Sequence, residues 1–289
     1  MIIGCVILNY NDYPTTLTLL NMIKRYESIN YIVVVDNNST DNSYSILAKE
    51  ESSKIHLIRT QLNGGYSYGN NIGISHLSKY KIDLIIIANP DILFEEDIVK
   101  KMIKSFMIDK NLSAVAPYAL NSTGRKTLEP AWKLNNSFRE LMQTSKIISK
   151  LFKDGNKYSE EEIRINCCSV DILPGSFLML DYKKFESIGF FDESVFLYCE
   201  ERIMAVKFKE KGYKSKLLID ESYIHNHSTS INKSIKSYHR KQRIWLKSRK
   251  YYLLKYRSSN TGFKVLVHVF YIYLYIELLI IAFAKKYFN

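Results

Sequence analysis

Residues 31–43 read YIVVVDNNSTDNS, a run of mostly β-branched residues that stops at Asp36 and gives way to polar residues. A short apolar run bounded by Asp and Asn is typical of a buried β-strand. The same pattern recurs on both sides of it and predicts strands at 2–8, 55–58 and 84–88. Segments of helical length and spacing lie between them, at 14–28, 42–50 and 68–78. This alternation predicts an α/β fold, with a mostly parallel sheet and helices on both faces.

The rest of the chain continues this pattern less regularly. A helix is predicted at 95–108, a strand at 112–117 and an apolar strand pair at 170–180, interrupted by Pro174, Gly175 and Ser176. A second group of elements follows, namely a helix at 199–211, a strand at 214–220 and a basic helix at 235–257. Residues 121–166 are irregular and are interpreted as a variable insert. We therefore expect one domain at 1–231 and a helical extension at 232–289.

The charge of the chain is concentrated in one region. The 289 residues include 41 Lys and Arg and 29 Asp and Glu, a net charge of +12, and 46% are hydrophobic, which excludes a mostly disordered chain. Residues 207–264 hold sixteen basic and three acidic side chains, 16 − 3 = +13, so the remainder is near neutral. The four cysteines form no CxxC pair, so we expect neither a zinc ribbon nor a disulfide scaffold, and a reducing setting fits. No secretory leader is expected.

An apolar segment at 265–284 follows the basic region and contains Glu277. Its length just reaches the roughly 20 residues that a spanning helix needs, but a central Glu is costly in lipid. A basic neighbour and Tyr271, Tyr273 and Tyr275 favour a helix that lies on the membrane surface, with a buried core or homodimer contact as the alternative. The basic region could also serve nucleic acid, but the adjoining apolar run favours a membrane, so no nucleic-acid partner is predicted.

Polar loops follow each of the first four predicted strands. Ligands bind parallel α/β sheets at the carboxyl ends of the strands, so these loops are candidate binding sites. Asp36 at a strand tip suits a nucleoside, whereas helix capping is the favoured interpretation of residues 39–43. The glycines of the third loop permit close approach of a phosphate, although the loop matches neither GxGxxG nor a P-loop. A single carboxylate at Asp91 can help hold Mg²⁺ on a diphosphate, although an Asn-Pro-Asp sequence is usually a turn.

Six ordered motifs together resemble the family 2 glycosyltransferases of GT-A fold, particularly the bacterial rhamnosyltransferase-like branch. The motifs are VILNYN, VVVDNNSTDNS, NGGYSYGNNIGI, IIIANPDI, PGSFLMLDYKKFESIGFFDESVFLYCEE and HNHSTS, beginning at residues 6, 33, 63, 85, 174 and 225. The resemblance covers roughly residues 2–231. It implies a Rossmann-like catalytic domain that carries a C-terminal helical extension.

The resemblance implies a donor site and a metal site. The residues placed on the nucleotide-sugar side are Asn9, Asn11, Asp36, Asn38, Asn63, Gly64, Gly65, Asn71, Asn89 and Asp91. Asp91 matches the last acid of the Asp-x-Asp motif that holds Mg²⁺ or Mn²⁺, and Asn89 replaces its first acid. His225 matches the late histidine of the metal shell, with His227 as the alternative. Gly175 and Ser176 match a turn on the acceptor side.

The resemblance also implies the catalytic base. The stretch FLYCEERIM matches Glu-Asp-x-Asp-Leu in the family, so Glu201 takes the place of the base, with Glu200 before it. The base removes the acceptor hydroxyl proton while the oxygen attacks the anomeric carbon opposite the leaving diphosphate. Ile203 replaces the following acid of the motif. Without the resemblance, paired glutamates at a helix start would be interpreted as charges that offset the helix dipole.

The implied function is inverting, metal-dependent transfer of rhamnose or a hexose from a UDP- or dTDP-sugar. The expected acceptor is a lipid-linked saccharide of bacterial surface polysaccharide, and the expected location is the cytoplasmic face of the inner membrane, with peripheral contact through the C-terminal segment. Two alternatives are a nucleotidyltransferase of related architecture and a basic membrane-binding protein whose site has decayed. Residues 8–16 lack the Gly-rich loop with Arg and Lys that the first alternative needs.

Overall fold

The computed structural model describes residues 1–126, 130–152, 157–166, 168–226, 237–258 and 260–287. Its centre is a nine-stranded sheet with the strand order β3-β2-β1-β4-β8-β6-β9-β5, and β7 also pairs with β9. The strands are β1 (Ile3–Asn9), β2 (Tyr31–Asp36), β3 (Ile55–Arg59), β4 (Leu84–Ala88), β5 (Ile92–Leu93), β6 (Leu112–Leu120), β7 (Ser169–Val170), β8 (Phe177–Asp181) and β9 (Lys214–His225).

The four predicted N-terminal strands form the parallel half of this sheet. β1 pairs in parallel with β2 and β4, and β2 pairs in parallel with β3. β8 then enters antiparallel between β4 and β6, and β5 lies antiparallel to β9. The carboxyl ends of β1, β2 and β4 therefore meet at one edge, where Asn9 aligns with Asp36 and Ala88 precedes Asn89.

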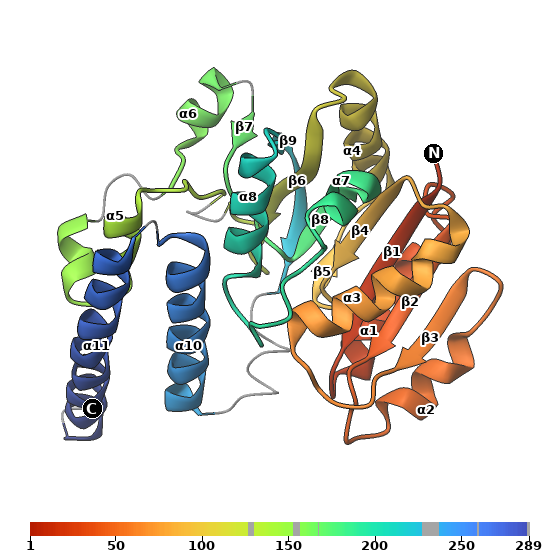
Figure 1. Cartoon of the computed structure of the whole chain (residues 1–289). Coiled ribbons are helices and arrows are strands. Elements are labelled where there is room, and N and C mark those ends of the chain that lie inside the picture. Colours follow the sequence, from red (N-terminus) through yellow and green to blue (C-terminus); the bar gives the residue numbers. More distant parts are fainter. Residues whose placement is uncertain (127–129, 153–156, 167, 227–236, 259, 288–289) are drawn as a thin grey trace.

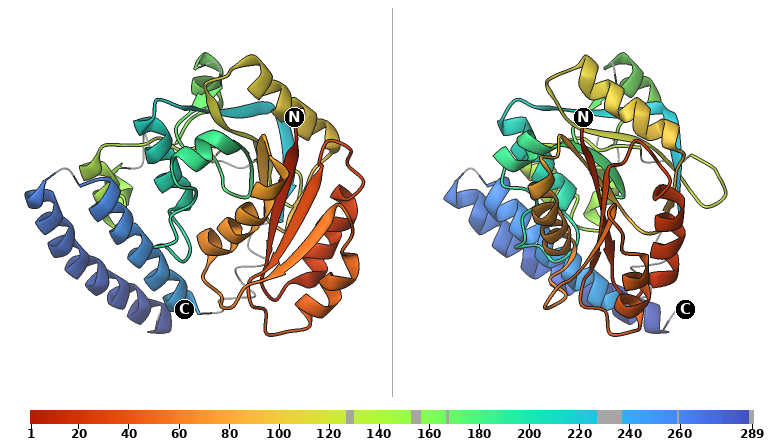
Figure 2. Two further views of the ribbon diagram at one scale, coloured as in Figure 1. Left: turned by 45° about the vertical axis from the view of Figure 1, so that its right-hand side comes forward. Right: turned by 90° about the vertical axis from the view of Figure 1, so that its right-hand side faces the viewer.

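Helices cover both faces of the sheet, as predicted (Figure 1, Figure 2). The helices that cover it are α1 (Tyr13–Ile23), α2 (Ser43–Leu47), α3 (Tyr66–Leu77), α4 (Glu96–Ile108), α7 (Tyr182–Ser187) and α8 (Glu200–Glu210), with short 3₁₀ turns η1 (Ala48–Glu50) and η2 (Ser78–Tyr80). Alternate side chains of a strand point to opposite faces. Ile3, Cys5 and Ile7 of β1 pack with α1 and α4, whereas Val6 packs with α3 and α8.

Some predicted boundaries differ from the structure. The first helix ends at Ile23 rather than at residue 28, because the Tyr26 hydroxyl donates to the Phe94 carbonyl and the Ser28 amide to Glu96. The predicted strand pair at 170–180 is reduced to β7 and β8, and Ile172 instead pairs with Trp132 of the insert. The insert holds α5 (Ser137–Met142), η3 (Ile148–Phe152) and α6 (Glu160–Ile165).

Two long C-terminal helices, α10 (Tyr238–Tyr256) and α11 (Thr261–Tyr287), pack side by side at one end of the molecule (Figure 1). They share a third apolar cluster with α5 and α8. Ile203, the residue that replaces an acid of the family motif, is buried in this cluster. An apolar residue at this position therefore packs against the C-terminal helices. Residues 235 and 236, where the predicted basic helix would begin, lie outside the described residues.

Glu277 of α11 is buried inside the protein. Its carboxylate accepts hydrogen bonds from the Ser145 hydroxyl at 2.9 Å and from the Ile147 amide at 2.7 Å. These contacts join α11 to the segment between α5 and η3. By length and composition, Thr261–Ile281 is apolar enough to cross a membrane, a property that core helices of soluble proteins can share.

A buried ion pair holds α10 against the insert. The Arg249 guanidinium lies 2.8 Å from a carboxylate oxygen of Glu140, and both side chains are almost fully buried. Arg202 lies 3.3 Å from the other oxygen of Glu140, so removal of Arg249 takes away the nearer of two cations. Breaking a buried ion pair typically costs about 3–5 kcal/mol. We therefore expect Arg249→Met to lower the free energy of unfolding by about that amount, measured by urea denaturation. Arg243→Met, an exposed position on the same helix, should change it little, and equal losses for both variants would contradict this assignment.

Candidate functional site

A buried polar pair joins the ends of the first two strands. The Asn9 amide nitrogen donates to Asp36 Oδ1 at 3.0 Å and to the Ser39 hydroxyl at 3.2 Å, and both Asn9 and Asp36 are fully buried. The other oxygen of Asp36 accepts from the Ser39 amide and lies 3.6 Å from Arg59 Nε. The structure therefore brings Asn9 and Asp36 together as a fixed unit beneath the loop surface.

The adjacent loop residues have a left-handed backbone. Asn11 and Asn38 have φ angles of +53° and +59°, a region that Asn tolerates better than most residues. The Asn11 side chain accepts from the Thr40 amide at 2.8 Å and so links the first loop to the second. The capping alternative applies to Asp41, whose carboxylate accepts from the Ser43 amide at the start of α2, whereas Asn42 makes no side-chain cap.

The third loop is tied to the second and to the segment before α8. The Asn37 amide nitrogen donates to Asn63 Oδ1 at 3.0 Å and to the Gly65 carbonyl at 3.1 Å. Gly65 has a φ of +91°, and a Cβ on it would overlap the Phe196 carbonyl. A glycine is therefore required there. A side chain on Gly64 would collide with the ring of Tyr68.

The turn at Gly175 and Ser176 connects the strand ends to the predicted base. The Tyr66 hydroxyl donates to the Gly175 carbonyl at 2.8 Å, and Gly175 lies against the Glu201 carboxylate, so that a Cβ on it would overlap Glu201 Oε1. On the other side, the Asn89 amide donates to the Ser176 carbonyl at 2.8 Å. A single turn therefore contacts the loop after β4, the start of α3 and the start of α8.

Glu200 and Glu201 lie at the first turn of α8, next to each other. Burial raises the pKa of Glu200 well above its ordinary value, and repulsion from Glu201 raises it further. Burial also raises the pKa of Glu201, while the Gly175 amide favours its charged form. Among the described residues, none donates a hydrogen bond to Glu200 Oε1. The two carboxyl groups therefore titrate as a coupled pair, and the pair gives up its last proton less readily than an ordinary glutamate does.

The backbone before this pair adopts a rare conformation. Tyr198 and Cys199 both have φ angles of +73°, a left-handed region that costs non-glycine residues energy. The segment is held by the Ser248 hydroxyl, which donates to the Leu197 carbonyl at 2.7 Å, and by the Tyr66 amide, which donates to the Phe196 carbonyl at 2.8 Å. Local strain of this kind is common where a reactive side chain must be aimed.

Asp91 and His225 meet at the opposite side of the turn. Their Oδ1 and Nε2 atoms lie 3.3 Å apart, because Ile92 pairs with His225 across β5 and β9. Two such ligands fit a divalent cation that takes its remaining oxygens from a diphosphate and water. No cluster of three His, Cys, Asp or Glu side chains occurs in the part of the chain that the structure describes. His227, the alternative ligand, lies outside the described residues.

The side chain of Asn71, a predicted donor-side residue, makes its hydrogen bonds to the segment before α8. The Asn71 side chain exchanges hydrogen bonds with the backbone of Phe191 and donates to Glu193 at 2.8 Å. These hydrogen bonds hold the segment before α8 against α3. Among the described residues, Asn71 forms none with Asn9 or Asp36. Sequence reasoning missed Arg59 and Tyr66. Arg59 could have been found as the last residue of a strand, in register with Asp36, but a local pattern gives no signal for the contact of Tyr66 with Gly175.

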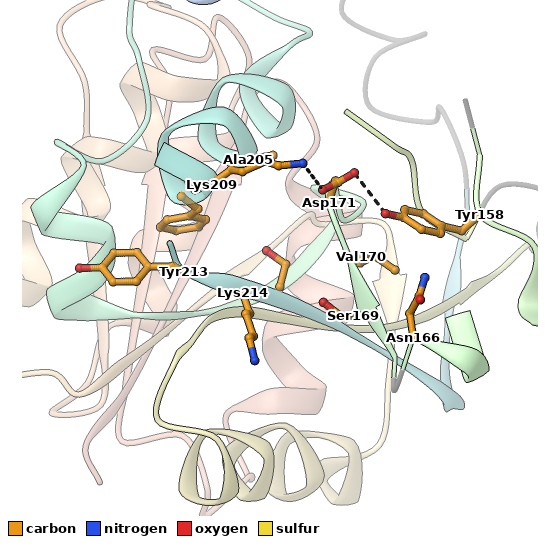
Figure 3. A pocket seen from close by; sticks show the side chains of 11 residues that line it. Tyr158, Asn166, Ser169, Val170, Asp171, Ala205, Lys209, Tyr213 and Lys214 are labelled. Carbon is orange, nitrogen blue, oxygen red and sulfur yellow. Dashed lines mark hydrogen bonds and ion pairs between the residues drawn. The ribbon is translucent and has the colours of Figure 1, made fainter. Parts of the chain in front are cut away.

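A separate cavity of about 350 Å³ lies between α8 and the strands β7 and β9 (Figure 3). Its lining includes Tyr158, Asp171 and Lys209, and no predicted site residue. The Asp171 carboxylate accepts from the Tyr158 hydroxyl at 3.1 Å and lies 3.1 Å from Lys209 Nζ. These three polar side chains of the cavity are thus paired with one another.

The contact between Gly175 and Glu201 can be tested directly. A Cβ on Gly175 would overlap Glu201 Oε1, so Gly175→Ala must displace the carboxylate. A misplacement of about 1 Å can cost about a hundredfold in rate. For the reaction that the resemblance implies, we expect kcat to fall by about that factor, while the affinity for the nucleotide is kept. Gly262→Ala controls for the substitution itself, because a Cβ there meets only Asn260 Oδ1 at 3.4 Å, an ordinary contact. An unchanged kcat for Gly175→Ala would contradict the contact.

Comparison with known families agrees with these loops. The model of the family described as glycosyl transferase family 2 matches residues 5–179, more than half of the chain. The chain belongs to glycosyltransferase family 2. Among curated relatives, the family 2 chain is 26% identical over 200 residues to the low-salt glycan biosynthesis hexosyltransferase Agl10 of Haloferax volcanii. It is 25% identical over 193 residues to the rhamnosyltransferase WbbL of Escherichia coli. These alignments cover 69% and 61% of this chain, and 59% and 70% of the relatives.

Solved structures show the same fold. The mannosyltransferase PcManGT from Pyrobaculum calidifontis, in complex with GDP-Man and Mn²⁺, superposes with a TM-score of 0.58 at 15% identity, over 99% of this chain and 75% of that one. GalNAc-T7 with UDP, GalNAc and Mn²⁺ superposes with a TM-score of 0.59 at 13% identity, over 78% of this chain and 44% of that one. The predicted family and GT-A type fold are thereby confirmed.

Proposed function

We propose that this family 2 protein transfers a sugar, rhamnose or a hexose, with inversion from a nucleoside-diphosphate donor to a hydroxyl of a saccharide. The observation that carries this proposal is the turn at Gly175 and Ser176. Half-buried Glu201 lies on one side of this turn, and the strand-end loops that we propose bind the donor lie on the other, which supports the proposal. A base next to a nucleotide site is the arrangement that single-displacement transfer requires.

Glu201 is the proposed base. The Gly175 amide orients its carboxylate, and the raised pKa makes it a better proton acceptor once ionised. Glu200 is buried beside it and is the group whose pKa is held well above the ordinary range. In this assignment Glu200 keeps the proton, while Glu201 removes the acceptor hydroxyl proton as that oxygen attacks the anomeric carbon. The rate should therefore fall as the pH drops through the raised pKa of Glu201.

Donor binding is assigned to the loops after β1 to β4. Asp36 and Asn9 support the nucleoside part, with Asn11, Asn38, Asn63, Gly64, Gly65 and Asn89 around it. Asp91 and His225 would hold Mg²⁺ or Mn²⁺, which supplies positive charge to the diphosphate leaving group when bound. Both solved relatives named above contain Mn²⁺. A UDP- or dTDP-sugar is the donor we favour. Asn71 stays among the proposed donor-side residues, and its side chain also holds the segment around Phe191.

The acceptor is proposed to be a lipid-linked saccharide of a surface polysaccharide, met at the cytoplasmic face of the cell membrane. The two curated relatives are a glycan biosynthesis hexosyltransferase and a rhamnosyltransferase, which supports a saccharide acceptor. We further propose that residues 1–231 form the catalytic domain and that residues 232–289 form its helical extension. Gly175 and Ser176 line the acceptor side of this arrangement.

The proposal is tested with a donor screen. Purified protein is incubated with Mn²⁺ and a panel of UDP- and dTDP-sugars, and nucleoside diphosphate release is measured together with thermal shifts on UDP and dTDP. We expect one donor to be turned over and its nucleotide to raise Tm. No turnover of any donor, together with no thermal shift on either nucleotide, would contradict the enzyme assignment and favour a decayed site.

A further inference from the structure

The outer face of α11 carries a continuous apolar strip. Its members are 51–69% exposed and follow one another at helical spacing: Val265, Val269, Ile272, Ile276, Leu279, Ile280 and Phe283. At a rise of 1.5 Å per residue, the strip is about 27 Å long. Monomeric soluble proteins rarely expose a contiguous apolar surface of this extent unless it binds something.

The opposite face of α11 packs against the rest of the protein. Val267, Tyr271 and Leu274 are buried against α8 and α10, and Glu277 receives its hydrogen bonds from Ser145 and Ile147. A spanning position would surround this face with lipid and remove these partners from Glu277. The bound arrangement consistent with the structure therefore leaves α11 on its own protein, with only the apolar strip turned outward.

The positive charge around the apolar strip favours an anionic lipid surface over a second copy of this chain. Residues 237–287 contain eleven Lys and Arg and one acid, Glu277, so 11 − 1 = +10. Arg240, Arg243 and Lys247 are exposed on α10, and Lys264 is exposed at the start of α11. Two copies of this chain joined through the strip would bring two such basic regions together, which is unfavourable. Anionic lipid headgroups attract the same region.

We propose that the apolar strip of α11 docks on the surface of an anionic lipid bilayer, with the helix lying along the membrane plane. The docked helix pair also contacts the segment that leads to Glu200. Asp192 of that segment accepts from the Tyr251 hydroxyl at 2.9 Å and lies 3.3 Å from Lys255 Nζ, both on α10. If the proposed function holds, docking therefore keeps the catalytic glutamates near an acceptor embedded in the same bilayer.

The test is sedimentation of the full chain with vesicles, without donor or acceptor, so its result is independent of the proposed transfer reaction. Vesicles of phosphatidylcholine mixed with phosphatidylglycerol are compared with pure phosphatidylcholine. We expect binding to the anionic vesicles, and a fall of about tenfold or more in partitioning for Ile272→Ser combined with Ile276→Ser. The matched control is Met107→Ser combined with Ile108→Ser on α4, where both residues are similarly exposed, and it should bind as the wild type does.

Two further measurements keep the outcome clear. Thermal denaturation shows whether each variant is folded, and light scattering after size exclusion gives the oligomeric state. Vesicle binding by the α11 variant at the wild-type level would overturn the proposal. A wild-type dimer that the α11 variant converts to a monomer, with no vesicle binding by either, would also overturn it and would assign the strip to contact between two copies.

Discussion

Glu201→Gln is expected to lower the rate of sugar transfer by about a hundredfold to ten-thousandfold, the range that a general base contributes. The substituted side chain keeps the shape that packs near Gly175 but cannot accept the hydroxyl proton. Nucleotide affinity should stay within about twofold of the wild type, because the strand-end loops are untouched. The measurements are kcat by nucleoside diphosphate release and the Kd of the nucleotide by calorimetry, both with Mn²⁺.

Glu200→Gln is the matched control, one residue away on the same helix turn. In the proposed assignment Glu200 keeps its proton, and Gln is a neutral side chain of the same size. We therefore expect Glu200→Gln to retain transfer, with the acid side of the pH profile still set by the pKa of Glu201, which burial raises. If Glu200→Gln were inactive and Glu201→Gln active, Glu200 would be the base and the assignment of Glu201 would be wrong.

Asp91→Asn is expected to have the second largest effect. It removes the one carboxylate of the Asp91–His225 pair and keeps its size. A bound divalent cation supplies several kcal/mol of charge stabilisation to a diphosphate, so kcat/KM should fall about a hundredfold or more. The dependence of nucleotide affinity on Mn²⁺, followed by calorimetry, should be lost as well.

Asp220→Asn controls for the loss of one carboxylate, since Asp220 is an exposed residue of the same strand as His225 and pairs with Arg164. It should leave both the affinity and its metal dependence unchanged. Mn²⁺-dependent nucleotide binding by Asp91→Asn at the wild-type level would place the cation elsewhere.

The strand ends were predictable because each depends on local sequence. The β-branched run that ends at Asp36 could only be buried, and the polar residues after it had to lie at the edge of the sheet. The entry of β8 between β4 and β6 was not predictable in the same way. It depends on pairing between residues about ninety positions apart, such as Ile86 and Met179, for which an apolar strand carries no local signal.

The candidate site was likewise predictable in its residues but not in the contacts between them. Residue identity indicated Glu201, Asp91 and the loop residues through the motifs. The contacts that arrange them, from Tyr66 to Gly175 and from Arg59 to Asp36, arise from packing between distant segments. Glu277 was also predictable only in part. Its charge indicated that it would not lie in lipid, but no local pattern indicated that Ser145 and Ile147 would donate hydrogen bonds to it.

The most direct test of the central claim is the anomeric configuration of the product, determined by NMR with the donor and acceptor on which the protein is active. Inverting transfer with Glu201 as base predicts a new linkage of the configuration opposite to that of the donor, formed in equal amount with released nucleoside diphosphate. A product that retains the donor configuration would contradict the single-displacement mechanism and the role assigned to Glu201.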